Sequence, residues 1–369
     1  MITVLEIGQV VAGPTAGLIF SDLGFRVIKI ENPNGGDISR KLTGSSSGTF
    51  EYYNRGKESI ALDFRTDTGK KILEGLIKNA DIIVENLGPG SMDKIINQDR
   101  IKQLNPKIIY LSIKGYMCGP YENRKSLDFP IEIESGIAYM TGLKNKPMRI
   151  GSSAIDMATA MMGVMLVLDK LRRHESGVIK IGLFETAMFL VGQHIVTYQK
   201  EKRELMPLNE ENFAWGIYDF FMSSDNKKIF IAISTDTQWG DFCRAFNIPP
   251  RDEYKSNIQR YNQRDKLIPE IQKILISYNL NDIILRLNKF NISYGILNRP
   301  WDLLKNEHAL MHMVNAEYNG TDFIMPYVPG TRNNKKNIEN LGCSSLKILR
   351  ELGYTAEEIK NFIDSGVIK

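Results

Sequence analysis

The chain has 369 residues, of which 43% are hydrophobic and 24% are charged. This mixture is typical of globular proteins and excludes disordered, collagen-like and coiled-coil classes, and the length predicts about two domains. The 47 lysines and arginines against 43 aspartates and glutamates leave a formal charge of +4, too small a balance to indicate a nucleic-acid-binding surface.

The cysteines and the N-terminal segment predict a cytoplasmic protein with no membrane segment. Cys118, Cys243 and Cys343 lie far apart and form no C-x-x-C motif, which favours reduced thiols over a disulfide framework or a zinc site. The N-terminal segment has no basic region and reaches Glu6 after five residues, unlike a signal peptide. The longest strongly apolar stretch, 158–168, is shorter than the roughly 20 residues needed to span a bilayer.

Residues 1–113 alternate between apolar runs and helical patterns. Strands are predicted at 3–7, 26–30, 59–62, 82–84 and 108–113, and helices from the Gly13-Pro14 break to Leu23, at 68–79 and at 92–104. Strands that alternate with helices predict an α/β fold with a mostly parallel sheet covered on both faces. Such sheets bind ligands at the carboxyl ends of their strands.

The strongest helical pattern covers residues 158–172, in which apolar side chains recur at spacings of three and four. A strand at 178–184 and a helix at 185–199 follow. The charged segment 200–204 then marks the end of the first domain.

Residues 213–317 predict a smaller α+β domain. Segments 217–221 and 229–233 have the pattern of a β-hairpin, and helices are predicted near 239–246 and 265–278. The tail, 345–368, is helical in pattern and contains a T-x-x-E capping box from Thr355 to Glu358. The larger domain is therefore expected to be discontinuous, made of residues 1–200 and 318–369.

The turn G-Q-V-V-A-G, from Gly8 to Gly13, lies where a nucleotide-binding turn would lie, between a strand and a helix. It lacks the G-x-G-x-x-G fingerprint, and Pro14 and Thr15 replace the Lys and Ser/Thr of a P-loop. Glycines of an ordinary α/β turn are the favoured interpretation.

Asp156 follows G-S-S-A-I and precedes a small-residue helix, which permits two interpretations. An aspartate at this place commonly caps the helix by accepting its first free N–H groups. A carboxylate at a helix start among small and apolar residues is also poorly solvated and pre-oriented, as a nucleophile requires. The spacing alone does not separate the two.

Other catalytic patterns are weak. His308 and His312 have i, i+4 spacing, but the general-base glutamate and third ligand of an H-E-x-x-H zinc site are missing. No G-x-S-x-G nucleophile elbow occurs.

Several segments together resemble the class III coenzyme A transferases of CaiB/BaiF type, the family that includes formyl-CoA transferase, carnitine CoA-transferase and α-methylacyl-CoA racemase. The segments follow one another along the chain: V-A-G-P-T-A-G-L-I-F-S-D-L-G-F-R-V-I-K-I-E (11–31), G-G-D-I-S-R (35–40), N-R-G-K-E-S-I-A-L-D-F (54–64), A-D-I-I-V-E-N-L-G-P-G (80–90), L-N-P-K-I-I-Y-L-S-I-K-G-Y (104–116), L-D-F-P-I-E-I-E-S-G (127–136), G-S-S-A-I-D-M (151–157) and the C-terminal L-R-E-L-G-Y-T-A-E-E-I. The resemblance covers essentially the whole chain.

The resemblance implies a Rossmann-like large domain, an interlocked homodimer and a CoA-transferase reaction. Asp156 then matches the family aspartate that attacks an acyl-CoA thioester, forms a mixed anhydride and an aspartyl-CoA thioester, and passes CoA to a carboxylic acid. Acyl-CoA and small carboxylic acids are the implied partners. No metal, nucleic acid, membrane or tightly bound cofactor is implied.

The resemblance also implies CoA contacts on loops at the carboxyl edge of the sheet. The matching residues are Val11, Ala12, Asn32, Leu62, Arg65, Asn86, Leu87, Gly88, Lys94, Lys114 and Tyr116. Lys114 and Arg65 are expected to meet phosphates, and Leu62 and Leu87 to flank adenine. Asn32 and Lys94 stand where members similar to formyl-CoA transferase carry arginines.

Two alternatives remain. Racemases of the family use a histidine in G-H-D-x-N-Y, and Leu127 stands at its place, so proton exchange of that type is disfavoured. A non-catalytic CoA-binding protein is the alternative from another class, distinguished by tight CoA binding without a covalent adduct.

Overall fold

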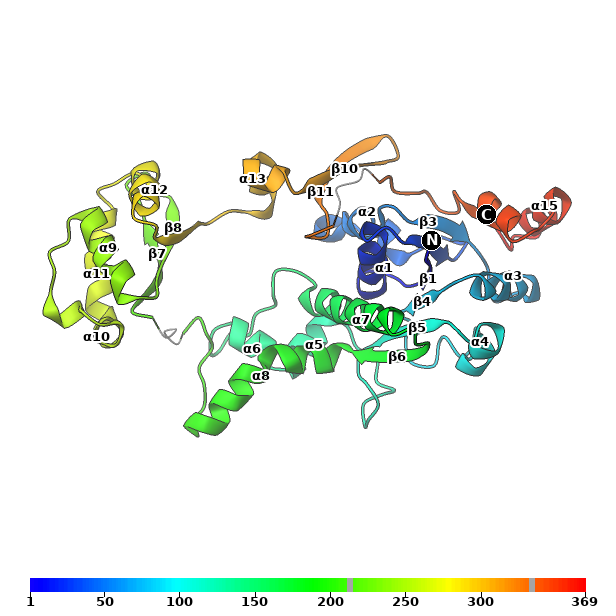
Figure 1. Ribbon diagram of the computed structural model, residues 1–369, viewed down its shortest axis with the longest axis horizontal. Helices are drawn as coiled ribbons and strands as arrows, with labels where there is room; N and C mark the ends of the chain where they lie inside the picture. Colours follow the sequence, from blue (N-terminus) through cyan, green and yellow to red (C-terminus); the bar gives the residue numbers. More distant parts are fainter. Residues whose placement is uncertain (211–214, 332–335) are drawn as a thin grey trace. The chain divides into compact units, whose positions relative to one another are not determined.

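The computed structural model describes residues 1–210, 215–331 and 336–369, and the chain divides into two compact units (Figure 1). The first unit contains Met1–Leu205 and Glu307–Lys369, and the second contains Met206–Asn306. Residues 307–317 therefore belong to the first unit, although we expected them in the smaller domain. Residues 213–214, where that domain was expected to begin, lie outside the described residues.

The first unit is built on a parallel sheet with the strand order β3-β2-β1-β4-β5-β6, which confirms the predicted α/β fold. The strands are β1 (Thr3–Ile7), β2 (Arg26–Glu31), β3 (Glu58–Ala61), β4 (Ile82–Glu85), β5 (Ile109–Lys114) and β6 (Gly177–Gly182). The chain first adds strands on one side of β1 and then places β4 on the other. The order therefore reverses between β1 and β4, and open α/β sheets bind ligands at such a switch point.

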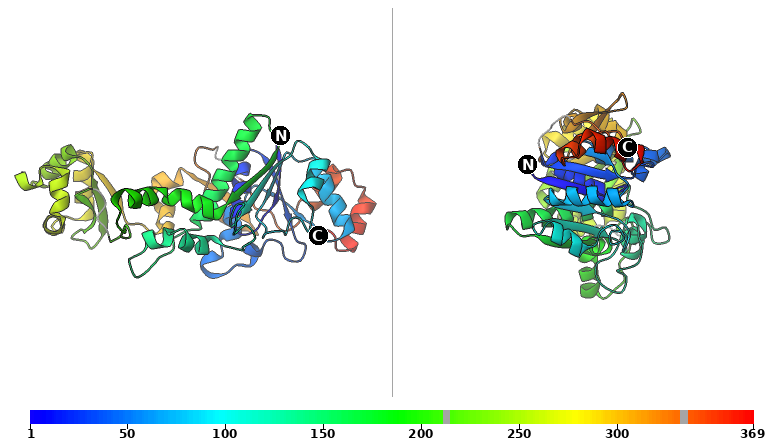
Figure 2. Two further views of the ribbon diagram at one scale, coloured as in Figure 1. Left: turned by 90° about the horizontal axis from the view of Figure 1, so that it is seen from below. Right: turned by 90° about the vertical axis from the view of Figure 1, so that its right-hand side faces the viewer.

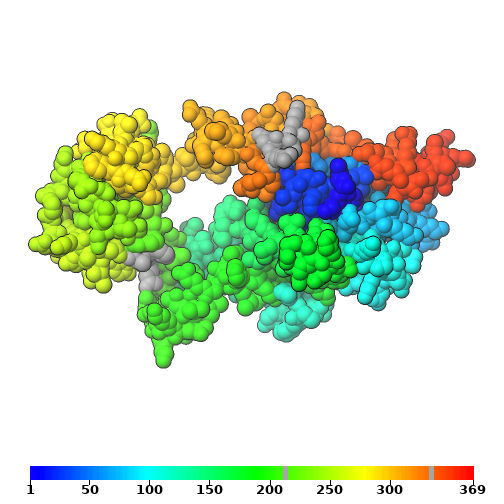
Figure 3. All heavy atoms as spheres, in the orientation of Figure 1, coloured from blue at the N-terminus to red at the C-terminus, as the bar shows by residue number. Residues whose placement is uncertain are grey.

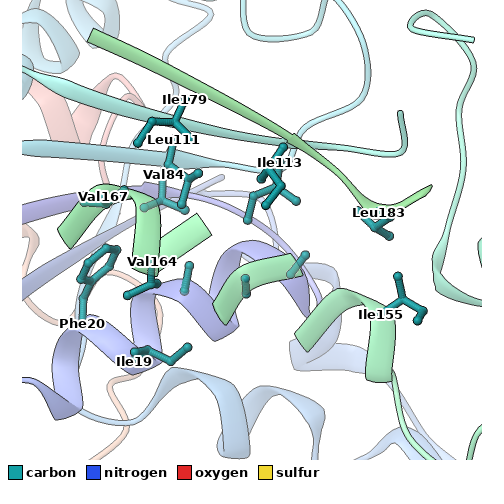
Figure 4. Packing of buried hydrophobic residues seen from close by; sticks show 14 of the residues in the cluster. Ile19, Phe20, Val84, Leu111, Ile113, Ile155, Val164, Val167, Ile179 and Leu183 are labelled. Atoms are coloured by element: carbon teal, nitrogen blue, oxygen red, sulfur yellow. The ribbon is translucent and has the colours of Figure 1, made fainter. Parts of the chain in front are cut away.

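Helices cover both faces of this sheet (Figure 2). One face is covered by α1 (Ala12–Asp22), α7 (Ala154–Arg172) and α8 (Leu183–Glu201), and the other by α3 (Asp67–Lys78), α4 (Gln98–Leu104), α14 (Ser345–Glu351) and α15 (Ala356–Asp364). Successive strand residues point to opposite faces, so Val4 joins one core and Leu5 the other. Figure 4 shows Phe20 of α1 and Val164 of α7 on the side of the sheet that carries Val84.

The C-terminal helices belong to the first unit. Ile348 and Ile359 are buried in the same core as Ile60 of β3, and Ile368 forms a β-bridge with Leu62. In Figure 3 the red C-terminal atoms lie beside the blue and cyan atoms of the N-terminal half. The predicted capping box is confirmed, since Thr355 accepts a hydrogen bond from the Glu358 backbone and Glu358 accepts one in return.

Short elements complete the first unit. They are the helices α2 (Thr49–Asn54), α5 (Asp128–Glu134), α6 (Ile137–Thr141) and α13 (Glu307–Leu310), the 3-10 turns η1 (Ile38–Lys41) and η2 (Gly44–Ser46), and the antiparallel strands β10 (Met313–Tyr318) and β11 (Thr321–Pro326). None of the helices in the described part of the chain has the length and apolar character needed to cross a membrane.

The second unit is an antiparallel sheet of order β7-β8-β9 packed against helices. Its elements are β7 (Ile217–Met222), β8 (Lys228–Ile233), β9 (Ser293–Ile296), α9 (Asp236–Phe246), α10 (Asn257–Asn262), α11 (Arg264–Leu275), α12 (Leu280–Lys289), η3 (Asp252–Tyr254) and η4 (Pro300–Lys305). The predicted hairpin and the helices near 239–246 and 265–278 are confirmed. The strand β9 and the helices α10 and α12 carried no prediction.

Several predicted boundaries differ from the structure. The helix expected at 158–172 begins four residues earlier, at Ala154. The helix expected at 92–104 begins only at Gln98, because Asn97 has an extended backbone and accepts a hydrogen bond from the Arg100 amide, which starts the helix there. The strand expected at 178–184 ends at Gly182, and the next two residues already form the first turn of α8.

Candidate active site

The loop after β1 and the loop after β4 meet at the switch point of the sheet. Asn86 ties them together, because its Oδ1 accepts the Gln9 N–H at 2.9 Å and its Nδ2 donates to the Gln9 carbonyl at 3.0 Å. A Cβ atom on Gly8 or Gly13 would lie 3.0 Å or 2.7 Å from that same Oδ1. The two glycines therefore allow the close approach of Asn86, which explains the turn without a nucleotide.

Val11 and Ala12 lie at the start of α1, directly beyond this tether. No side chain caps this helix, so the amides of Ala12 and Gly13 have no partner within it. Both residues are buried.

Lys114 braces the end of β5 against the loop after β4. Its Nζ donates to Glu85 Oε2 and to the Leu87 carbonyl, both at 2.7 Å. Glu85 is fully buried and also accepts from Ser112 Oγ at 2.6 Å. Lys114 and Glu85 line a cavity of about 170 Å³, below the roughly 300 to 1,000 Å³ typical of ligand pockets, so it holds at most a fragment of a ligand.

The remaining predicted CoA contacts also follow the carboxyl ends of strands, but they differ in accessibility. Asn32, Gly88 and Lys94 are exposed, and Arg65 is exposed and paired with Asp63. The side chain of Leu62 is fully buried in the core, so it is out of reach of an adenine ring. Tyr116 is buried and donates to Glu134 Oε2 at 2.6 Å.

Asp156 is the third residue of α7, so its interpretation as the N-cap is wrong. Ser153 occupies the N-cap position and makes no side-chain capping bond. Asp128 of α5 caps the helix instead, because its Oδ2 accepts the N–H groups of Ile155 and Asp156, both at 3.0 Å. The carboxylate of Asp156 is therefore not used for capping.

The environment of Asp156 disfavours its negative charge. Burial and, second, the charge of Asp128 raise its pKa to about 7, although Arg149 acts in the opposite direction. The pKa of Tyr53 is also raised, to about 12. Burial is the main cause, and Tyr52, Asp156 and Asp128 add to it. Perturbed carboxyl groups of this kind cluster at functional sites.

A second carboxyl group, that of Glu132, lies on the same helix as Asp128. Glu132 is fully buried, and its Oε2 accepts the Ile150 N–H at 2.9 Å. Burial and the neighbouring Asp128 raise the Glu132 pKa to about 7. Arg149 Nη2 lies 3.6 Å from Asp128 Oδ1, within ion-pair distance.

No role was predicted for Asp128, Glu132 or Arg149. The i, i+4 spacing of Asp128 and Glu132 in L-D-F-P-I-E places both carboxyl groups on one helix face, and that spacing was the available signal. Their link to Asp156 crosses from α5 to α7, so no local pattern contains it.

A small apolar cluster joins the first loop to the start of α7. Val11, Leu18 and Tyr53 are buried in it, and Val10 and Met157 pack against them. Because Met157 follows Asp156, this cluster joins the start of α7, which carries Asp156, to the loop at the switch point. No group of three or more potential metal ligands occurs among residues 1–210, 215–331 and 336–369.

Comparison with known proteins identifies the family of the chain. The chain matches CoA-transferase family III over residues 2–334, so it belongs to that family and is a family III CoA-transferase, which confirms the resemblance found in the sequence. It is 26% identical over 351 residues to the succinate–glutarate CoA-transferase of Agrobacterium fabrum, covering 90% of this chain and 87% of the relative. It is also 26% identical over 392 residues to the succinyl-CoA–L-malate CoA-transferase alpha subunit of Chloroflexus aurantiacus, covering 100% of this chain and 92% of the relative.

Solved structures show the same fold. A CaiB/BaiF family protein from Brucella suis superposes with a TM-score of 0.81 at 24% identity, covering 95% of this chain and 98% of that one. The α/β architecture is thus shared along nearly the full length.

Proposed function

We infer that this enzyme transfers coenzyme A from an acyl-CoA thioester to a carboxylic acid with Asp156 as the nucleophile. The observation that carries the proposal is the position of Asp156: it lies in the first turn of α7, is not used as a cap, has a pKa raised to about 7, and stands beside the loop at the switch point. A poorly solvated carboxylate is a stronger nucleophile than a hydrated one.

The reaction proceeds by four acyl exchanges. An Asp156 oxygen attacks the thioester carbonyl carbon, the carbon–sulfur bond breaks, and CoA leaves as thiolate from a mixed anhydride. The thiolate attacks the Asp156 carbonyl carbon and releases the donor acid, which leaves an aspartyl-CoA thioester. The acceptor carboxylate then attacks this thioester, which releases CoA thiolate and leaves a mixed anhydride between Asp156 and the acceptor. The thiolate attacks the acceptor acyl carbon of this anhydride, forms the new acyl-CoA and releases the Asp156 carboxylate. No redox equivalent is consumed.

The chain supplies candidate groups for each charge that develops. The free amides of Ala12 and Gly13 at the start of α1 are suited to a tetrahedral oxyanion. Lys114, Arg65 and Lys94 are the cations proposed for the CoA phosphates, and the backbone of Asn86, Leu87 and Gly88 for its remaining polar groups. Leu87, which is only partly buried, remains the candidate for contact with adenine.

Short dicarboxylic acids are the first substrates to test, since the two relatives described above are named for succinate, glutarate and malate. We propose an interlocked homodimer as the active form, supported by an apolar surface on α7 and α8. Its exposed residues include Met161, Met165, Leu166, Met188, Phe189 and Val196. Exposed apolar side chains that gather on one surface are typical of an interaction site.

The test is a panel of acyl-CoA donors and carboxylic acid acceptors, read by mass spectrometry. Exchange of CoA with at least one pair, and an acyl or CoA adduct on Asp156 trapped by hydroxylamine or borohydride, is the expected result. Tight CoA binding without exchange or adduct on every pair would instead identify a non-catalytic CoA-binding protein.

A further inference from the structure

Val10 has an unfavourable backbone conformation in the loop at the switch point. Its φ is 67°, in the left-handed region that β-branched residues rarely adopt. Six other non-glycine residues of the described chain share a positive φ: His174, Lys202, Asn226, Asn247, Asn291 and Asn319. None of these is β-branched. A conformation of this kind persists only where the surroundings hold it, and it is found chiefly at functional sites.

Asp37 holds this conformation directly. The Val10 N–H points at the Asp37 carboxylate, with Oδ1 at 3.2 Å and Oδ2 at 3.3 Å. The preceding residue, Gln9, is fixed on its other side by the two hydrogen bonds to Asn86. The loop is thus held from β4 and from the segment after β2 at once.

Asp37 is itself firmly positioned. Only 1% of its surface is exposed, and its Oδ2 lies 2.9 Å from Lys29 Nζ, which also donates to the Gly8 carbonyl at 2.9 Å. Its Oδ1 accepts from Ser39 Oγ at 2.7 Å. Burial raises the Asp37 pKa, but the charge and hydrogen bond of Lys29 and the hydrogen bonds from Ser39 outweigh it and keep the pKa below its ordinary value, so the group is ionised at neutral pH.

In this conformation the Val10 side chain packs against the cluster of Val11, Leu18 and Tyr53, against which Met157, the neighbour of Asp156, also packs. In the favoured β or α regions the loop would follow another path away from β1, and the start of α1 would move with respect to Asp156. The shape of the loop and the position of the nucleophile are therefore linked through one small cluster.

We propose that Asp37 is a positioning residue for the acyl-CoA site: it holds Val10 in the left-handed conformation and so keeps the Gly8–Ala12 loop in the shape that receives CoA beside Asp156. This inference rests on the proposed function, because it takes the switch-point loop as part of the CoA site. It concerns a residue that the sequence resemblance did not assign.

The experiment measures CoA binding by calorimetry and KM against kcat in the full-length protein. Asp37→Ala should weaken CoA binding by about tenfold, the size expected when one strained residue is released, and should raise KM more than it lowers kcat. Asp37→Asn, which keeps an acceptor oxygen, should weaken binding less. Asp22→Ala removes another buried, ion-paired aspartate, at the far end of α1, and should lower thermal stability without changing CoA affinity.

Second substitutions at Val10 test whether Asp37 acts by holding the Val10 backbone or only stabilises the fold. Glycine adopts a positive φ freely, whereas alanine does not, so Val10→Gly should restore CoA binding to Asp37→Ala and Val10→Ala should not. Equal rescue by both, or parent affinity in Asp37→Ala itself, overturns the proposal. If Asp37→Ala does not fold, Val10→Pro decides, because proline fixes φ near −65° and has no N–H. It should bind CoA about tenfold more weakly than Val10→Gly, and equal affinity of the two refutes the inference.

Measurements on the parent protein distinguish failure of the proposed CoA transfer from failure of the proposed role of Asp37. A parent that neither binds CoA nor exchanges it defeats the proposed function and this inference with it. A parent that exchanges CoA, with an Asp37→Ala variant of equal KM, defeats this inference alone.

Discussion

The Asp128 carboxylate accepts the backbone N–H of Asp156 at 3.0 Å, and the same oxygen accepts the N–H of Ile155. Asp128 therefore accepts two N–H groups in the first turn of α7, while the side chain of Asp156, which belongs to that turn, is not needed as a cap. The negative charge of Asp128 also makes ionisation of Asp156 less favourable. Because Asp128 caps the helix and Asp156 is the proposed nucleophile, each acid can be tested by its own substitution.

Asp156→Asn should abolish transfer while the protein remains folded. An amide is a poor nucleophile and cannot carry the thioester, whereas capping by Asp128 does not depend on the Asp156 side chain. Asp156→Ala should behave alike. CoA exchange and trapped adducts, measured by mass spectrometry beside thermal denaturation, provide the check. An Asn variant that turns over near the parent rate, with deamidation excluded by mass, contradicts the catalytic assignment.

Asp156 should also lower the stability of the parent protein as the pH rises. Its pKa lies near 7 in the folded state against an ordinary value of 3.8, so the folded state binds the proton more tightly. This stabilisation is complete below about pH 4 and is lost as the pH rises to 7, by up to about 4 kcal/mol. The melting temperature of Asp156→Asn relative to that of the parent should therefore increase between about pH 4 and pH 7 and change little above pH 7. A constant difference over this range would show that Asp156 titrates normally.

Asp128→Asn should move the pH dependence of the reaction. An asparagine oxygen still accepts the two N–H groups, but the negative charge that raises the Asp156 pKa is removed. The rising limb of kcat/KM, near pH 7 in the parent, should therefore move to lower pH, although burial still holds the Asp156 pKa above its ordinary value. Glu185→Gln, in the first turn of α8, is the matched control and should leave the limb in place. An unmoved limb in Asp128→Asn means that Asp128 acts through the backbone alone.

The sequence was sufficient for those features that depend on local pattern. The strands of the parallel sheet, the hairpin at 217–233 and the capping box at Thr355 follow from apolar periodicity and turn residues, and they were predicted. The helix at 92–104 was predicted too long, because its apolar residues Met92 and Ile96 are buried without being part of a helix. Periodicity does not distinguish these two arrangements.

The site was predictable in outline but not in its contacts. Family motifs identified Asp156 and the loops after the strands, yet the cap from Asp128 and the bond from Val10 to Asp37 join residues that are 28 and 27 positions apart. No periodic pattern spans such separations. The buried side chain of Leu62 was likewise not foreseeable, since it lies in a core to which Ile368, at the other end of the chain, also contributes.

Lys114 should serve both the fold and CoA binding, and two variants separate these roles. Lys114→Met leaves the fully buried Glu85 without its cation, which should cost about 3 to 5 kcal/mol of stability. Adding Glu85→Gln removes both charges and should recover most of that loss. If Lys114 also contacts a phosphate, the double variant should still bind CoA more weakly than the parent by calorimetry. Parent affinity in the double variant would limit Lys114 to bracing Glu85.

The apolar surface of α7 and α8 predicts how the oligomer can be broken. Phe189 is 74% exposed and lies on α8 between Met188 and Leu190, both also exposed. Phe189→Glu would place a charge within the proposed dimer interface, where burying an unpaired carboxylate is highly unfavourable. Light scattering and sedimentation should show a dimer for the parent and monomers for this variant. Ile363→Glu on α15, which alters an exposed apolar residue of the opposite sheet face, should remain dimeric. A parent that is monomeric in dilute solution, or a dimeric Phe189→Glu, would remove this surface from the interface.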